Sequence, residues 1–109
     1  MASKAKIQSL NNKVKKFTVG LGGTIKIDDD YRTEININTK VGRLDVKLHK
    51  PDSARLLFSI FTCFDEPKKA AELMPSDRSL NTWSGKYNIH DTHSDICMQI
   101  FQSFLKSIL

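Results

Sequence analysis

The stretch between residues 33 and 64 alternates between apolar and polar positions in a pattern that predicts three consecutive β-strands. Residues 33–39 and 43–49 place an aliphatic side chain at every second position, with polar residues between them. A period of two is typical of a strand with one buried face and one solvated face. The connection between these strands ends at Gly42, which predicts a hairpin because glycine adopts a positive φ at little cost. The side chains expected to face the core are Ile35, Ile37, Leu44, Val46 and Leu48.

The third segment, residues 55–64, is apolar on both of its alternating faces. A helix capped by Asp52 or Ser53 is the alternative interpretation. We favour a strand, because aromatic and β-branched residues are enriched in strands. Apolar side chains on both faces indicate a central strand that is covered on both sides. One face holds Leu56, Phe58, Ile60 and Phe64, and the other holds Leu57, Ser59, Phe61 and Cys63.

The N-terminal residues predict an amphipathic helix that Ser3 caps. An alternative pairs residues 17–21 with residues 24–28 as two strands, with Gly22-Gly23 as the hairpin turn between them. Both elements can coexist if the helix ends near Lys16. The apolar stripe of the helix consists of Ile7, Leu10, Val14 and Phe17, and Asn11 and Asn12 interrupt it.

A short helix and a further strand are predicted after the third strand. Asp65 is a good N-cap for a helix that runs to Met74, and Pro75 ends it. Residues 75–82 form a polar loop in this interpretation. Residues 83–90 then enter a strand through a turn at Trp83-Ser84-Gly85.

The C-terminal residues predict the longest continuous apolar stripe of the chain. Thr92 or Ser94 would cap this helix, with Asp95 in its first turn. We expect the helix to pack across one face of the sheet, and a helix that forms a dimer is the alternative. The stripe consists of Ile96, Cys97, Ile100, Phe101, Phe104, Leu105 and Ile108.

These elements together predict an α+β fold. An antiparallel sheet of four to five strands is packed by the C-terminal amphipathic helix, a short middle helix and an N-terminal helix. We divide the chain into a basic N-terminal segment, residues 1–16, and a single α+β domain, residues 17–109.

Charge is concentrated at the N-terminus. The chain has a formal net charge of +5, with 17 basic and 12 acidic residues. The first 16 residues contain five of the basic residues and no acid, so the rest of the chain is neutral. Such a segment can contact nucleic acid or an acidic protein surface, and a solubilising terminus is the simpler alternative. Its lysines are Lys4, Lys6, Lys13, Lys15 and Lys16.

The remaining composition limits the cellular setting. Cys63 and Cys97 lie in apolar patterns, which indicates buried thiols rather than a disulfide or a metal pair. No apolar run is long enough to span a bilayer, and no leader resembles a signal peptide. We therefore expect a cytoplasmic monomer or homodimer with no membrane partner. No motif implies a cofactor.

Few residues suggest a chemical site. Histidine and aspartate bind transition metals, which makes His90, His93 and Asp95 candidate ligands. These residues span the end of a predicted strand and the start of a predicted helix. In that arrangement only two or three of these side chains and their neighbours could converge on one metal ion. A capping turn with exposed histidines is the favoured interpretation. Asp28-Asp29-Asp30 lacks the glycine and the distal glutamate of a calcium loop, so we expect a solvated turn there.

The stretch from Trp83 to His90 interleaves aromatic and cationic residues. Trp83, Lys86 and Tyr87 suit contacts with single-stranded nucleic acid or with a protein partner. Ser84-Gly85-Lys86 is not a phosphate-binding loop, because the first glycine is missing and Tyr87 replaces serine or threonine.

Residues 81–90 have the pattern Asn-x-x-Ser-Gly-Lys-aromatic-Asn-x-His. This run resembles small uncharacterised proteins of phages and mobile elements. Residues 63–70 are similar to the segment that precedes the run in those proteins. The resemblance implies an accessory protein of a phage or plasmid and assigns no activity to any residue.

Three functions remain open. The first is a non-catalytic phage or mobile-element protein that binds a host protein or a protein–nucleic-acid complex, most concretely as an inhibitor of a defence system such as CRISPR. The second is a small nucleic-acid-binding protein that uses the basic segment with Trp83, Lys86 and Tyr87. The third is a small metal-dependent enzyme that uses His90 and His93 with a nearby aspartate. No nucleophile–base pair or paired-carboxylate motif favours the third.

Overall fold

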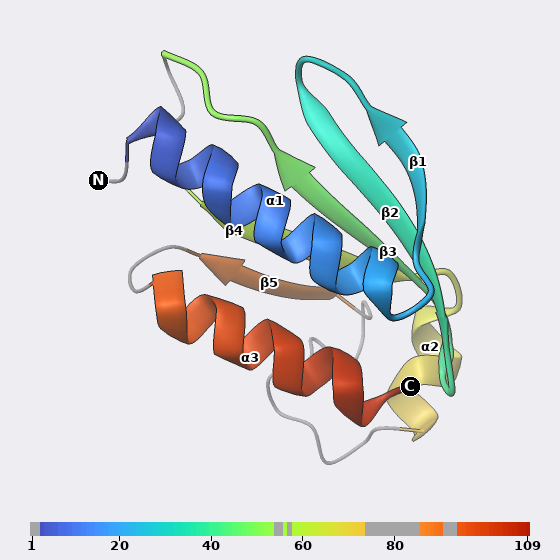
Figure 1. The fold of residues 1–109 in the computed structure, drawn as a ribbon. Coiled ribbons are helices and arrows are strands. Elements are labelled where there is room, and N and C mark those ends of the chain that lie inside the picture. Colours follow the sequence, from blue (N-terminus) through green and yellow to red (C-terminus); the bar gives the residue numbers. More distant parts are fainter. Residues whose placement is uncertain (1–2, 54–55, 57, 74–85, 91–93) are drawn as a thin grey trace.

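A five-stranded antiparallel sheet forms the centre of this computed structural model, and its strands lie side by side in chain order (Figure 1). The structure describes residues 3–53, 56, 58–73, 86–90 and 94–109. The predicted α+β class is confirmed. The strands are β1 (Thr24–Asp28), β2 (Arg32–Thr39), β3 (Gly42–His49), β4 (Ser59–Phe64) and β5 (Lys86–His90), and the helices are α1 (Lys4–Gly20), α2 (Pro67–Leu73) and α3 (Ser94–Ser107).

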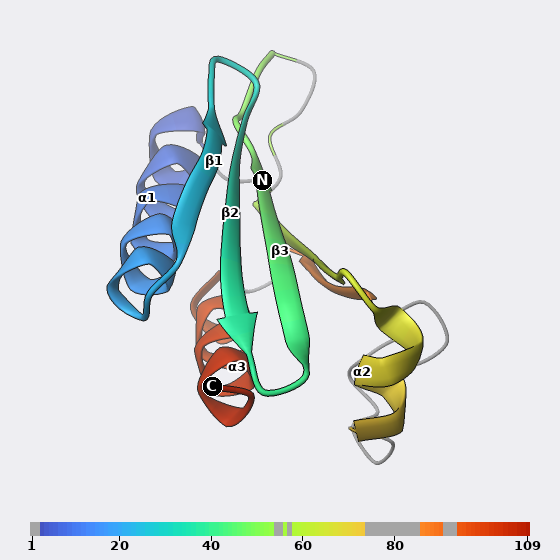
Figure 2. The same ribbon diagram turned by 90° about the vertical axis from the view of Figure 1, so that its right-hand side faces the viewer.

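Helices α1 and α3 lie on the same face of the sheet, which we call the inner face (Figures 1 and 2). Helix α1 contacts β2, and α3 contacts β5 and α1. Helix α2 follows β4 directly and lies on the side of the sheet away from α1 and α3 (Figure 2). The inner face and its two helices therefore enclose most of the core.

The core forms because the alternating aliphatics of the strands meet the apolar stripes of both helices. Every predicted inward-facing aliphatic of β2 and β3 is buried. Phe17 of α1 and Phe101 of α3 pack edge to face with their ring centroids 6.3 Å apart, which joins the two helices. The fully buried aliphatics of the strands and α1 are Ile7, Val14, Ile35, Leu44, Val46, Leu48 and Ile60.

Helix α1 extends one turn beyond the predicted end near Lys16. Ser3 caps it as predicted, because its Oγ accepts a hydrogen bond from the Lys6 backbone N–H at 3.2 Å. The predicted strand over residues 17–21 is wrong, since residues 17–20 are helical. The glycine pair instead ends the helix: Gly22 has φ 107°, and the Gly23 N–H donates to the Thr18 carbonyl at 2.9 Å. Strand β1 therefore pairs with β2.

The β2–β3 hairpin is built as its sequence predicts and is also tied to α3. Gly42 has φ 116° and pairs with Thr39, which leaves a two-residue loop. Thr39 Oγ1 accepts a hydrogen bond from the Val41 N–H at 3.1 Å. The Lys40 N–H donates to the Ile108 carbonyl at 2.7 Å, so the hairpin tip also holds the C-terminal end of α3 in place.

The third predicted segment is a strand, and it begins at Ser59. Phe58, Ile60 and Phe64 are buried as expected. Phe61 and Cys63, which should be covered on the other face, are only partly buried. Neither Cys63 nor Cys97 is in a disulfide bond, and Cys97 is buried as predicted. Leu57 and residues 83–85 of the predicted turn lie outside the described residues.

Helix α3 is rotated relative to the predicted stripe. Ile96 and Ile100 are 52% and 40% exposed, whereas Met98 is buried. At about 100° per residue, Ile96 and Ile100 lie on one flank of the helix, beyond the arc centred on Phe101. The core therefore takes a narrower arc of α3 than the predicted stripe. The two isoleucines are left on the surface.

Replacement of Phe101 by alanine tests the packing of α3. Phe101 is fully buried against Phe17, and such a truncation costs about 3–5 kcal/mol. We expect the melting temperature to fall by more than about 10 °C for a chain of this size. Ile96→Ala is the matched control on the same helix and leaves the melting temperature nearly unchanged. Equal effects of the two substitutions would show that the stripe does not face the core.

Candidate binding site

A polar pocket of about 230 Å³ opens between α1 and the strands that it covers. One face of α1, the end of β1, the start of β2 and Lys50, which directly follows β3, supply its walls. The pocket forms there because Asn11, Asn12 and Lys15 interrupt the apolar character of the helix on the side that faces the sheet. Its lining residues are Gln8, Asn11, Asn12, Lys15, Asp28, Thr33 and Lys50.

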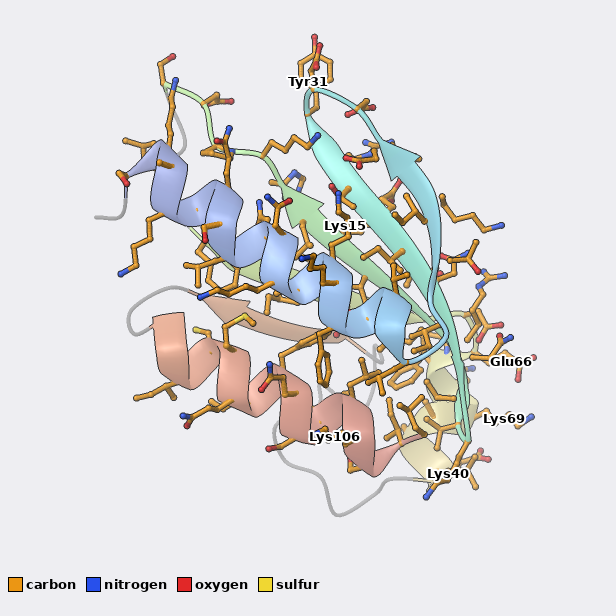
Figure 3. The ribbon with its side chains drawn as sticks, viewed as in Figure 1. Lys15, Tyr31, Lys40, Glu66, Lys69 and Lys106 are labelled. Atoms are coloured by element: carbon orange, nitrogen blue, oxygen red, sulfur yellow. The ribbon has the colours of Figure 1, made fainter. Side chains whose placement is uncertain are left out.

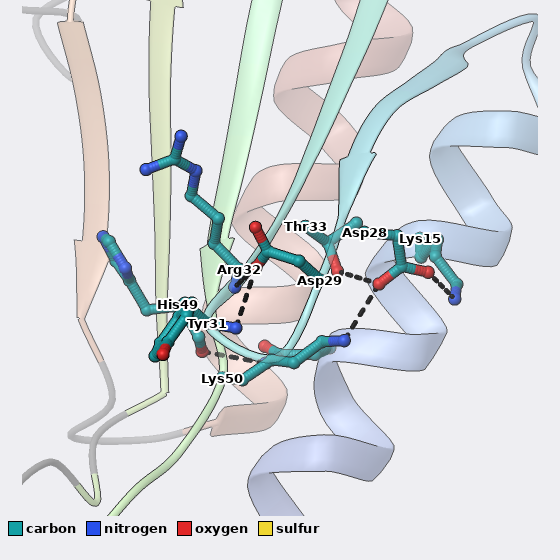
Figure 4. A network of polar contacts seen from close by, with 9 residues as sticks. Lys15, Asp28, Asp29, Tyr31, Arg32, Thr33, His49 and Lys50 are labelled. Carbon is teal, nitrogen blue, oxygen red and sulfur yellow. Dashed lines mark hydrogen bonds and ion pairs between the residues drawn. The ribbon is translucent and has the colours of Figure 1, made fainter.

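Asp28 is the centre of the charged part of this pocket (Figure 4). Its Oδ2 accepts from Lys15 Nζ at 3.2 Å, and its Oδ1 accepts from Lys50 Nζ at 3.0 Å. The Thr33 hydroxyl donates to the same Oδ1 at 3.1 Å. Lys15, Asp28 and Lys50 form an ion-pair cluster. Each of these three side chains is about one-third exposed, so solvent and solutes reach them.

The two ammonium groups hold the pKa of Asp28 at about 2, against an ordinary value of 3.8. The hydrogen bond from Lys50 is the largest cause, followed by those from Lys15 and Thr33. The neighbouring Asp29 also has a lowered pKa, because its carboxylate accepts backbone N–H bonds from Tyr31 and Arg32. The predicted solvated turn at residues 28–30 therefore holds two carboxylates that are fixed by hydrogen bonds.

Asn11 carries the one buried side-chain atom without a hydrogen-bond partner among the described residues. The side chain is 7% exposed, and its Nδ2 donates to the His49 carbonyl at 3.0 Å. Its Oδ1 accepts no hydrogen bond. Buried polar atoms are rarely left in this state.

The five lysines of the basic N-terminal segment do not act as one group. Lys15 points toward the sheet and pairs with Asp28, whereas the other four are exposed (Figure 3). In the part of the chain that the structure describes, none of those four forms an ion pair. Helix α1 is continuous across the expected boundary at residue 16 and buries Ile7, Leu10 and Val14 in the core. The exposed lysines are Lys4, Lys6, Lys13 and Lys16.

The outer face of the sheet is also charged, but its charges are paired with one another. Glu34 accepts from Arg32 at 3.2 Å and from Lys47 at 3.4 Å. Arg43 pairs with Asp45 at 3.3 Å. This face therefore presents a balanced set of charges, in contrast to the exposed face of α1.

The other predicted site residues lie in less well described parts of the chain. Trp83 and His93 are outside the described residues. The backbones of Lys86, Tyr87 and His90 belong to β5 and pair with Cys63, Thr62 and Ser59, and Asp95 is the second residue of α3. The side chains of these four residues are outside the description, so their predicted roles remain predictions.

No group of three or more histidine, cysteine, aspartate or glutamate side chains gathers within metal-binding reach in the described part of the chain. None of the helices described there is long and apolar enough to cross a membrane. Comparison with protein-family models, curated proteins and solved structures finds no significant match. What the protein binds is therefore inferred from its own residues.

The pocket combines Lys15 of the basic segment and Asp28 of the acidic run with residues that the sequence pattern did not single out as site residues. Asn11 stands four positions after Ile7, so helical geometry alone places it on the buried face. A polar residue on a buried helix face indicates a side chain that is either hydrogen-bonded or functional. The same residue could also be interpreted as a simple interruption of the apolar stripe. Lys50 carried no comparable signal, and the acidic run gave no sign that Asp28 meets Lys50, because this contact depends on the pairing of β1, β2 and β3.

Replacement of Asp28 by asparagine tests the ion-pair cluster through the acid dependence of stability. Because the folded-state pKa is lowered, the contribution of Asp28 is fully present above about pH 4 and is lost as the pH falls toward 2. We expect the free energy of unfolding of the wild type to fall more steeply between pH 4 and pH 2 than that of Asp28→Asn, as measured by denaturant titration. Asp30→Asn is the control and keeps the wild-type slope. Parallel curves for the wild type and Asp28→Asn would contradict the cluster.

Proposed function

We propose that the protein is a non-catalytic accessory protein of a phage or mobile element that binds an acidic surface of a host protein through the exposed face of α1. Inhibition of a host defence system, such as CRISPR, is the most concrete form of this function. The observation that carries the proposal is the group of exposed lysines on the side of α1 away from the core, namely Lys6, Lys13 and Lys16.

The lysines are presented by a rigid element. Because α1 is anchored by Ile7, Leu10 and Val14, its exposed face has a fixed shape before a partner arrives. A preorganised surface loses less conformational freedom on binding than a flexible tail does. Lys13 and Lys16 stand three residues apart and lie in one row along the helix.

The local charge is strongly one-sided. Asp28 is the first acidic residue of the chain, so α1 and most of β1 contain lysines and no carboxylate. Lys6 and Lys13 lie about 20° apart around the helix axis and extend the positive surface over two turns. An acidic partner would be steered toward this face, and its association would slow as the salt concentration rises.

Apolar side chains adjoin the basic row, which favours a protein partner over nucleic acid. Val19 continues the row of Lys13 and Lys16 after three more residues and is 40% exposed. Leu21 and Ile25, 37% and 42% exposed, follow at the α1–β1 connection. Protein interfaces combine such apolar centres with charged rims, whereas contacts to the phosphate backbone use cations and hydrogen-bond donors and no apolar side chains.

Nucleic acid is the second candidate, because the same lysines could neutralise phosphates and the neighbouring Ser9 and Asn12 could donate hydrogen bonds to them. In either case Trp83, Lys86 and Tyr87 remain predicted contact residues. The thiols of Cys63 and Cys97, which are not in disulfide bonds, support action in the cytoplasm of the host cell.

Charge reversal on α1 tests the proposal. We expect Lys13→Glu/Lys16→Glu to lose capture of a host protein by at least about tenfold, because several exposed charge contacts act together. The measurement is affinity capture from a lysate of the native host treated with nuclease, followed by titration of the purified partner. Lys40→Glu/Lys68→Glu is the matched control: it reverses two exposed lysines outside α1, changes the net charge equally and keeps wild-type affinity.

Titration with short single- and double-stranded oligonucleotides completes this test. The proposal predicts negligible binding at physiological salt. Tight binding that weakens steeply with salt and is lost in the α1 variant would overturn the ranking in favour of nucleic acid. Equal capture by the wild type and both double variants would remove α1 from the interface.

A further inference from the structure

The orphaned carbonyl oxygen of Asn11 points to a ligand. Asn11 lies among the apolar residues of α1, where an aliphatic side chain would pack without leaving a polar atom. Its Nδ2 is committed to the His49 carbonyl, which fixes the orientation of the amide. Oδ1 is therefore a buried acceptor without a donor, on a residue that lines the pocket.

The wall of the pocket around Asn11 has donors and positive charge to spare. Lys15 and Lys50 each have three N–H groups and use one on Asp28. The three charged groups together carry a net charge of +1. The amides of Gln8 and Asn12 complete the polar lining. This wall attracts an anion, and its two ammonium groups repel a metal ion.

We propose that the pocket binds a small hydroxylated oxyanion, whose anionic group contacts Lys15 and Lys50 and whose hydroxyl donates to Asn11 Oδ1. A hydroxyl fits this position because a neutral O–H satisfies an amide oxygen without bringing a second positive charge beside the lysines. A phosphate ester and a carboxylate share the required chemistry. None of the lining residues has an apolar side chain, so the pocket does not favour a hydrophobic ligand.

The size of the pocket limits the ligand. Its volume of about 230 Å³ lies below the range of roughly 300–1,000 Å³ that is typical of drug-sized ligands. A three- or four-carbon hydroxylated anion fits this space, and a dinucleotide does not. The site is separate from the exposed lysine row of α1, so it does not depend on the macromolecular function proposed above.

Calorimetric titration of the full chain with four probes tests this site. Glycerol 3-phosphate and glycerate carry both required groups, inorganic phosphate supplies an anion without a carbon-bound hydroxyl, and glycerol supplies hydroxyls without charge. We expect one or both hydroxylated anions to bind at least about tenfold more tightly than phosphate, and glycerol not to bind. Whichever of glycerol 3-phosphate and glycerate binds more tightly shows whether the site prefers a phosphate ester or a carboxylate.

Variants separate the pocket from general surface charge. Lys50→Met weakens binding of the preferred anion at least about tenfold, because it removes a charged hydrogen-bond donor. Lys26→Met is the matched control, since Lys26 is an exposed lysine of the same strand as Asp28 and does not line the pocket. Binding also shifts the NMR signals of the Asn11 side-chain amide in the wild type.

Three results would overturn the proposal. The first is the absence of saturable binding for every probe, which would mean that water alone fills the pocket. The second is equal weakening by Lys50→Met and Lys26→Met, which would show adventitious attraction to surface charge. The third is binding that leaves the Asn11 amide signals unchanged. Asn11→Leu would not be a decisive variant, because it also removes the hydrogen bond from Asn11 Nδ2 to the His49 carbonyl and so affects folding.

Discussion

The burial of one face of α1 against the inner face of the sheet is the constraint on which the rest of this structure depends. Ile7 and Val14 are completely buried, and burying an aliphatic side chain of this kind contributes about 1.5–3 kcal/mol. The same contact turns a lysine-rich terminus into a rigid helix. Because the helix cannot rotate, the three lysines on its outer side must face solvent while Lys15 and Asn11 must face the sheet. The exposed basic face and the polar pocket are thus two consequences of one packing interaction.

The pocket lies where this packing is incomplete. Asn11 interrupts the apolar contact at the middle of α1, and Lys15 follows it on the next turn. Strand β1 ends at Asp28, whose carboxylate neutralises much of the charge that Lys15 and Lys50 bring together. Without Asp28 the two ammonium groups would repel each other across the helix–sheet boundary. The ion pairs of Asp28 with Lys15 and Lys50 therefore lie at the edge of the core and join the helix to the sheet. The remaining N–H groups of the two lysines can donate to a ligand.

The sequence predicts most of the fold because local periodicity determines which face of each element is buried. The alternation in β2 and β3 and the apolar stripe of α1 can each be recognised from neighbouring residues in the sequence, without knowledge of tertiary contacts. The prediction failed where tertiary contacts decide between local alternatives. Gly22-Gly23 suits both a hairpin turn and a helix end, and the close approach of Gly23 to the Thr18 carbonyl favours the helix end. Likewise, the exposure of Ile96 depends on the rotation of α3 against the core.

Amide hydrogen exchange in α1, followed by NMR, tests the central claim most directly. If the lysine-rich helix is an integral part of the core, the backbone amides of Leu10 and Val14 exchange nearly as slowly as that of Val46 in the central strand β3. Exchange of the α1 amides at rates typical of an unfolded peptide, with Val46 still protected, would contradict the account. The basic segment would then be a detachable arm, and neither the rigid lysine row nor the pocket would exist.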